Sequence, residues 1–132
     1  MCGITGFIGY KNRSLLTKLT KNLSLRGPDE DGFFVSDTDL VSFGHRRLSI
    51  TDLSTGQQPM LDVSRRYVIV YNGEIYNHHE LRKELIRDGA IFATHHSDTE
   101  VILNGFITWG EKFLDKLNGM FSFAIFDKVN KK

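Results

Sequence analysis

The sequence has 132 residues, of which 40% are hydrophobic and 25% charged, a composition typical of one globular domain. Its 17 basic and 16 acidic residues are interspersed and leave a net charge of +1, which excludes the extended basic surface of a nucleic-acid-binding protein. No apolar run approaches the roughly 18 residues of a membrane span, and the first residues resemble no signal peptide. We therefore expect a cytoplasmic domain that binds neither nucleic acid nor a membrane.

The first half of the chain is expected to build a sheet around one helix. Gly3 to Ile8 alternates small and apolar residues like a buried strand, and leucines then recur at helical spacing until Gly27 and Pro28 end the helix. Those leucines are Leu15, Leu16, Leu19 and Leu23. Three strand-like runs come next, at Phe33 to Ser36, Leu40 to His45 and Arg47 to Thr51.

The second half is expected to alternate strands with helices. Tyr67 to Tyr71 is rich in strand formers and ends at Asn72-Gly73, a pair typical of a two-residue hairpin turn. Capping patterns predict the starts of two helices, at Asn77 with Glu80 and at Ser97 with Glu100. Met120 to Phe126 then indicates a final apolar strand. Because hairpin signals outnumber parallel crossovers, the predicted class is α+β.

Cys2 is the only cysteine, so an internal disulfide is excluded and the reactivity of the thiol becomes the question. Methionine is normally trimmed from a start such as Met-Cys-Gly, which would leave Cys2 with a free α-amine able to accept the proton of its own thiol. On position alone, however, a cysteine at residue 2 is more often a small apolar residue at a chain start.

The surrounding motifs favour the reactive interpretation. They are MCGI, RGPD at 26–29, HRRLSITD at 45–52, YNGEIYN at 71–77, HSDTEVI at 96–102 and LNGMFSFAIFD at 117–127. In this order they resemble the class II glutamine amidotransferases, and most closely the glutaminase domain of the glutamine-hydrolysing asparagine synthetases. The resemblance implies the N-terminal nucleophile hydrolase fold, a four-layer αββα sandwich of antiparallel sheets.

The resemblance also implies a role for particular residues. Cys2 corresponds to the attacking thiol, and the side-chain amide of Asn72 with the backbone N–H of Gly73 corresponds to the oxyanion hole. Arg47 corresponds to the arginine that binds the α-carboxylate of L-glutamine, and Asp98 to the carboxylate that pairs with its α-ammonium. The remaining substrate-binding positions are Leu48, Ser49, Ile50, Thr51 and Glu74.

Without the resemblance, simpler readings of these residues stay open. Asn72-Gly73 is then a hairpin turn, and Asp98 is an acidic residue in the first turn of a helix, where the macrodipole favours it. Arg46 competes with Arg47, although strand alternation places the two on opposite faces and the motif favours Arg47 as the inward one. The pairs His78-His79 and His95-His96 lack partnering cysteines, so no metal site is predicted.

We further expect residues 1–132 to be an incomplete glutaminase domain whose synthetase domain is absent. The resemblance implies no cofactor in this part, and ATP with Mg²⁺ in the synthetase domain that would use the ammonia to amidate aspartate. The unpaired Met120 to Phe126 strand would favour homo-oligomers and low activity. Alternatives are a non-catalytic amino-acid-binding or interaction fragment, and an amidotransferase of the same class with another acceptor.

Overall fold

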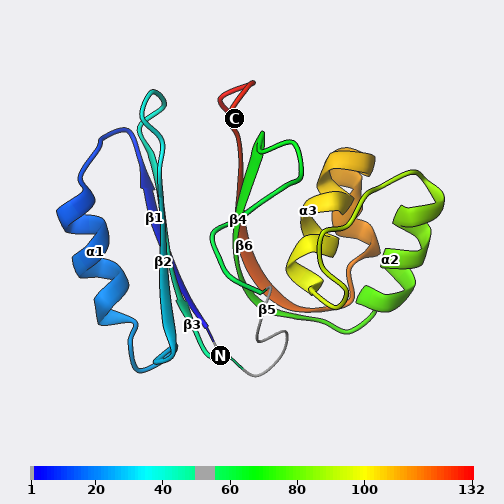
Figure 1. The fold of residues 1–132 in the computed structure, drawn as a ribbon, viewed down its shortest axis with the longest axis horizontal. Helices are drawn as coiled ribbons and strands as arrows, with labels where there is room; N and C mark the ends of the chain where they lie inside the picture. The colour runs from blue at the N-terminus through cyan, green and yellow to red at the C-terminus, as the bar shows by residue number, and fades with distance from the viewer. Residues whose placement is uncertain (1, 50–55) are drawn as a thin grey trace.

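The computed structural model describes residues 2–49 and 56–132, which form two three-stranded antiparallel sheets between helices. The first sheet has the order β1-β3-β2 and the second the order β4-β5-β6. The elements are β1 Gly3–Ile8, α1 Arg13–Asn22, β2 Glu30–Val35, β3 Val41–Arg47, β4 Met60–Leu61, β5 Tyr67–Ile75, α2 His78–Arg87, α3 Asp98–Trp109, the 3₁₀ helix η1 Gly110–Lys116, and β6 Gly119–Asp127. Figure 1 shows the resulting layers, with α1 outside the first sheet and α2 and α3 outside the second. The expected α+β αββα sandwich is thus confirmed.

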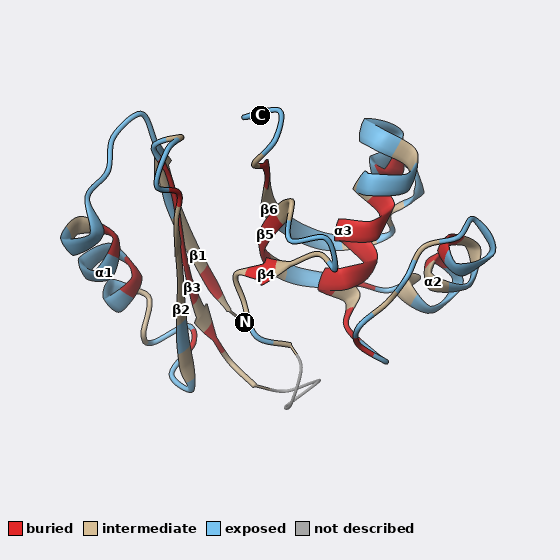
Figure 2. Cartoon of the chain, turned by 45° about the horizontal axis from the view of Figure 1, so that its top comes forward, coloured by how far each residue is buried: buried red, intermediate tan, exposed pale blue. Residues whose placement is uncertain are grey.

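Two apolar clusters hold these layers together. Val41 and Phe43 of β3 pack between the sheets against Val68, Val70 and Phe126. The alternate residues of β5 face the helices, in a second cluster formed by Met60, Ile69, Tyr71, Ile75, Leu81, Leu85, Val101, Ile102, Leu103 and Phe113. Because side chains alternate along a strand, β5 serves both clusters and is buried on both faces. Figure 2 shows this burial along β5 and α3, whereas much of α1 is exposed.

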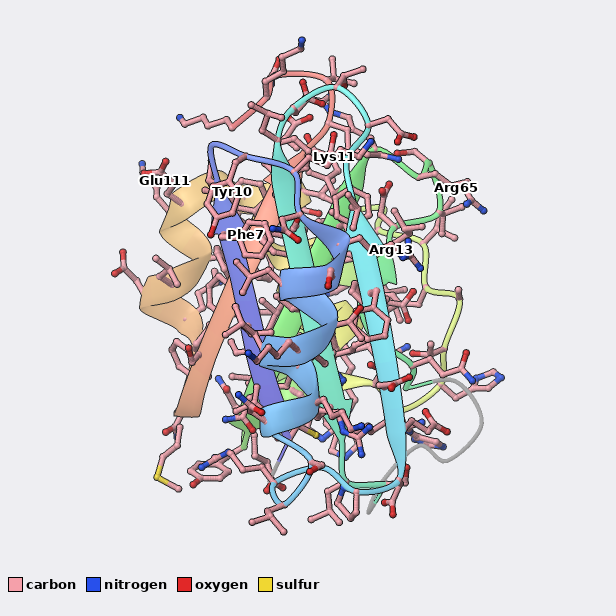
Figure 3. All side chains as sticks on the ribbon, turned by 90° about the vertical axis from the view of Figure 1, so that its left-hand side faces the viewer. Phe7, Tyr10, Lys11, Arg13, Arg65 and Glu111 are labelled. Atoms are coloured by element: carbon pink, nitrogen blue, oxygen red, sulfur yellow. The ribbon has the colours of Figure 1, made fainter. Side chains whose placement is uncertain are left out.

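Helix α1 covers the outer face of the first sheet, as Figure 3 shows from that side. Asn12 caps it by accepting a hydrogen bond from the Leu15 amide at 2.8 Å. The approach to the sheet is close, because a Cβ on Gly44 would lie 2.1 Å from Oγ1 of Thr20. The helix ends at Asn22, and the prediction that it continues to Gly27 was therefore wrong. The residues that follow turn back toward the sheet instead.

The strands of the first sheet differ from the predictions in two respects. β3 runs without a break through Arg47, so the separate strand predicted from Arg47 to Thr51 does not begin there, and Ile50 and Thr51 lie outside the described residues. β1 has the predicted bounds but is only partly buried, because it is an edge strand of its sheet and 75% of Ile8 is exposed. Alternation therefore predicted the strand correctly and its burial incorrectly.

Strand β5 continues past the point where a turn was predicted. Asn72 pairs with Ser122 of β6, and Gly73 pairs with Phe121, so the hairpin-turn reading of Asn72-Gly73 was wrong. Glycine is required at 73 for a different reason, since a Cβ there would lie 2.2 Å from the carbonyl oxygen of Met120. The pair is thus held within a strand by the close approach of β6.

The predicted helix starts are correct, but their caps differ. Ser97 accepts a hydrogen bond from the Glu100 amide at 3.3 Å, as a capping residue does. Asn77 precedes α2 without a side-chain capping bond. Its amide instead donates to the carbonyl of Lys116 at 2.9 Å and accepts from the amide of Asn118 at 3.0 Å. Within the described ranges, no helix is long and apolar enough to cross a membrane.

Candidate active site

A small cavity lies where one end of the first sheet meets β5 and the start of α3. Its volume is about 80 Å³. It is lined by Cys2, Arg47, Leu48, Gly56, Gln58, Tyr71, Asn72, Gly73, His96, Ser97, Asp98 and Thr99. Six of the residues to which the resemblance assigns a role thus meet here, although they lie up to 96 positions apart in the sequence. These six are Cys2, Arg47, Leu48, Asn72, Gly73 and Asp98.

Cys2 is half-buried and lies immediately before β1. Its Sγ is 4.0 Å from the carbonyl oxygen of Leu48, which follows β3. The Cys2 carbonyl accepts a hydrogen bond from Nε of Arg26 at 3.1 Å. The thiol is therefore fixed at the end of the first sheet by β1 pairing and by contacts to two loops. Met1, whose removal would free the α-amine, lies outside the described residues.

The two adjacent arginines take different places. Arg47 lines the cavity, is 4% exposed, and forms an ion pair with Glu30 at 3.0 Å. Arg46 points to the other face of β3, where it donates to the carbonyl oxygens of Gly27 at 2.6 Å and Pro28 at 3.0 Å. This is the separation that strand alternation predicts. A guanidinium at the cavity wall can bind a carboxylate through two N–H groups.

Residues 26–29 contact both Cys2, which precedes β1, and the end of β3, which carries Arg47. A Cβ on Gly27 would lie 2.4 Å from the carbonyl carbon of Arg46, so only glycine fits there. The amide of Asp29 donates to the carbonyl of Arg47 at 3.0 Å, and its carboxylate accepts from the amide of Ser49 at 2.6 Å. The RGPD motif thus positions the end of β3, a role that the sequence alone did not specify.

Asn72 and Gly73 enter the cavity from β5. Oδ1 of Asn72 is buried and has no hydrogen-bond partner among the residues that the structure describes. A buried polar atom without a partner costs free energy, so this acceptor oxygen can receive a hydrogen bond from a ligand N–H group. An amide side chain beside a backbone N–H is the donor pair that an oxyanion requires.

Asp98 opens α3 and faces β5 across the cavity. Its Oδ2 accepts hydrogen bonds from the hydroxyl of Tyr71 at 2.7 Å and from the amide of Ile75 at 3.3 Å. A carboxylate in this place can pair with a ligand ammonium. A carboxylate in the first turn of a helix also interacts favourably with the helix macrodipole. Asp98 can therefore both stabilise the start of α3 and bind a ligand.

The other predicted positions are less directly placed. Leu48 lines the cavity, whereas Ser49 and Glu74 are not among the described residues of its wall. Glu74 is exposed on β5 opposite Met120. Ile50 and Thr51 lie outside the described residues, so their predicted roles remain predictions.

Sequence reasoning missed two cavity residues that connect the others. Gln58 accepts a hydrogen bond from the Tyr71 amide at 2.6 Å and donates to Oγ1 of Thr99 at 3.4 Å. Tyr71 is the first residue of the YNGEIYN motif, and this position is the signal that could have drawn attention to it. Together, Gln58 and Tyr71 tie β5 to the start of α3.

A larger hollow of about 490 Å³ shares the lining residues Arg47 and Gln58 with this cavity. His45 lines it, is 1% exposed, and has an Nε2 without a hydrogen-bond partner among the described residues. Burial lowers the pKa of His45 to about 4, and the Arg47 cation acts in the same direction against the Tyr71 backbone and Glu30. His45 is therefore neutral at pH 7.

Across residues 2–49 and 56–132, no group of three or more His, Cys, Asp or Glu side chains is arranged to hold a metal ion. His78 and His79 contact each other, with ring centroids 3.9 Å apart, and His96 lines the cavity.

Known proteins with similar sequences include several asparagine synthetases. The chain is 43% identical over 135 residues to asparagine synthetase [glutamine-hydrolyzing] 3 of Bacillus subtilis, covering 97% of this chain and 22% of that protein. It is 41% identical over 132 residues to asparagine synthetase B [glutamine-hydrolyzing] of Escherichia coli, covering 96% of this chain and 23% of that protein. The chain thus spans less than a quarter of the length of these curated relatives.

A solved structure shares the fold. The glutamine phosphoribosylpyrophosphate amidotransferase of Bacillus subtilis superposes with a TM-score of 0.78 at 19% identity, over 97% of this chain and 35% of that one. The sequence profile of the family described as "Glutamine amidotransferase domain" matches residues 1–132. Because this match covers the whole chain, the chain belongs to the glutamine amidotransferase domain family.

Proposed function

We propose that this chain hydrolyses the side-chain amide of L-glutamine, with Cys2 as the nucleophile. The observation that carries the proposal is the convergence of Cys2, Arg47, Asn72, Gly73 and Asp98 on one cavity. A thiol, an amide donor pair, a cation and a carboxylate are the groups needed to attack an amide and to hold a free amino acid.

The reaction begins when the Cys2 thiol adds through its sulfur to the amide carbon of glutamine. Its proton passes to the α-amine of Cys2, which is free once Met1 is removed and whose ordinary pKa of about 8 suits proton transfer near neutrality. The tetrahedral oxyanion is stabilised by Nδ2 of Asn72 and the N–H of Gly73. Ammonia then leaves with a proton from the α-ammonium, and water hydrolyses the thioester to glutamate and free thiol.

Arg47 and Asp98 hold the amino-acid end of the substrate. Arg47 binds the α-carboxylate while Glu30 fixes its guanidinium at 3.0 Å. Asp98 pairs with the α-ammonium. Two charged contacts at one end of glutamine orient the amide at the other end toward Cys2. Substrate binding therefore places the amide carbon close to the thiol that attacks it.

We also propose that the ammonia serves a synthetase domain of the full-length protein that amidates aspartate with ATP and Mg²⁺. The names of the similar synthetases support this assignment. We assign ATP and Mg²⁺ to that synthetase domain and no cofactor to residues 1–132. Residues 1–132 are accordingly assigned the glutaminase step alone.

The nucleophile is tested by replacing Cys2 with alanine. Glutamate release from glutamine should fall at least about a thousandfold, because covalent catalysis is lost, while glutamine binding measured by calorimetry persists. The intact mass must first establish that Met1 has been removed. Lys18→Ala, an exposed change on α1, is the control. Turnover by Cys2→Ala within tenfold of the unmodified chain would exclude Cys2 as nucleophile, and binding without turnover by either protein would favour an amino-acid-binding function.

A further inference from the structure

The hydroxyl of Tyr71 connects the middle of β5 to the first turn of α3. It donates a hydrogen bond of 2.7 Å to Oδ2 of Asp98, and the Tyr71 side chain is 3% exposed. No motif assigns a role to this tyrosine. A hydrogen bond to a carboxylate in a buried place is stronger than one in water, so this contact constrains the Asp98 side chain.

The two oxygens of Asp98 have different tasks. Both hydrogen bonds that Asp98 accepts within the described residues, from Tyr71 and from the amide of Ile75, fall on Oδ2. Oδ1 therefore retains its acceptor capacity, and the carboxylate lines the cavity. Two donors from one strand on the same oxygen fix the rotation of the carboxylate and leave the second oxygen for a cationic ligand.

The tyrosine is itself held in place. Its ring belongs to the cluster between the second sheet and the helices. Its backbone amide donates to Gln58 at 2.6 Å, and Gln58 also reaches Thr99, the residue after Asp98, at 3.4 Å. Burial and the neighbouring Asp98 raise the pKa of Tyr71 far above its usual value, so the hydroxyl remains a donor at every physiological pH.

We propose that Tyr71 is a positioning residue that aims the free oxygen of Asp98 at the α-ammonium of the substrate and so determines selection for an α-amino acid. The inference rests on the proposed glutaminase function and extends it to a residue outside the Cys2, Asn72 and Gly73 machinery. Tyr71 acts through Asp98 and has no part in the thiol chemistry, so its removal should affect substrate binding and leave the chemical step unchanged.

The test is Tyr71→Phe, which removes the hydroxyl and keeps the ring. We expect KM for glutamine to rise about tenfold, as for the loss of one hydrogen bond to a charged group, while kcat changes less than about twofold. Tyr67→Phe is the matched control, because Tyr67 lies on the same strand and packs edge-on against Phe106 away from the cavity. Thermal denaturation of both variants checks that each is folded.

A double-mutant cycle separates positioning from a general packing effect. In an Asp98→Ala background, Tyr71→Phe should change the affinity for glutamine less than about twofold, because the group through which Tyr71 acts is gone. An equal loss in both backgrounds, or an unchanged KM in Tyr71→Phe alone, overturns the inference. Calorimetry of glutamine on Cys2→Ala variants repeats the comparison without turnover. If the unmodified chain binds glutamine and does not hydrolyse it, the proposed function fails while the role of Tyr71 is still decided.

Discussion

Arg46 and Arg47 have identical side chains and different tasks, because adjacent residues of β3 face opposite ways. Arg46 is held by the carbonyl oxygens of Gly27 and Pro28, whereas Arg47 is buried at the cavity with Glu30. We expect Arg47→Ala to weaken glutamine binding by about 2 to 5 kcal/mol, because a buried charge is left without its partner, and Arg46→Ala to weaken it far less. Calorimetry on folded variants measures both, and similar losses would show that the assignment of Arg47 is wrong.

His45 makes folding stability depend on pH. Its pKa is about 4 in the folded chain, where burial disfavours the charged form, and about 6.5 when the chain is unfolded. The unfolded state therefore binds more protons between these values, so the stability contributed by neutral His45 is complete above pH 6.5 and is lost as the pH falls toward 4. Two and a half pKa units correspond to at most about 3 to 4 kcal/mol.

Urea denaturation at pH 7.0 and pH 5.0 tests this dependence. The His45→Gln variant, which has no titrating group, should lose less stability between the two pH values than the unmodified chain. Parallel losses would assign the pH dependence to other groups. His95→Gln, which removes an exposed histidine, is the control and should leave the difference unchanged.

The side chain of Asn77 connects the start of helix α2 to the residues just before strand β6. Asn77 was expected to cap α2, but its amide bridges instead to the carbonyl of Lys116 and the amide of Asn118, just before β6. Asn77→Ala should therefore lower the free energy of unfolding by about 1 to 3 kcal/mol, since two long-range hydrogen bonds are lost.

Asn77→Ser distinguishes the bridge from a cap in thermal or urea denaturation. Serine is as good a helix cap as asparagine but is too short to replace both bridging contacts. It should therefore be about as destabilising as alanine, and a full rescue by serine would identify capping as the role of Asn77. Ser97→Ala, at the start of α3 where a capping bond is present, provides the comparison.

Across the molecule, the second sheet has an unpaired apolar edge. β6 pairs with β5 alone within the described residues, and Met120 and Phe121 on it are 71% and 38% exposed. Such an edge offers its free N–H and C=O groups to another strand, so we expect this chain to self-associate as its concentration rises. Light scattering coupled to size-exclusion chromatography measures this. Met120→Lys should reduce the association, whereas Val63→Lys, an exposed change outside β6, should not. A monomer at all concentrations would contradict the expectation.

Patterns among neighbouring residues correctly predicted those secondary-structure elements that depend on neighbouring residues alone. β1, the starts of α2 and α3, and most of β6 were predicted within about a residue, because alternation and capping depend on neighbouring residues. The end of α1 and the length of β5 were predicted wrongly. The ends of these elements are set by contacts between residues that are far apart in the sequence, such as the pairing of Gly73 with β6.

The sequence by itself determined the family, the single thiol and the residues that the motifs place in the cavity, because these depend on the kind and order of residues. Only the tertiary structure decided which side chains connect them. Tyr71 reaches Asp98 across 27 positions and Arg26 reaches the carbonyl of Cys2 across 24. Contacts over such separations follow from the stacking of two sheets and a helix, which no local pattern of residues encodes.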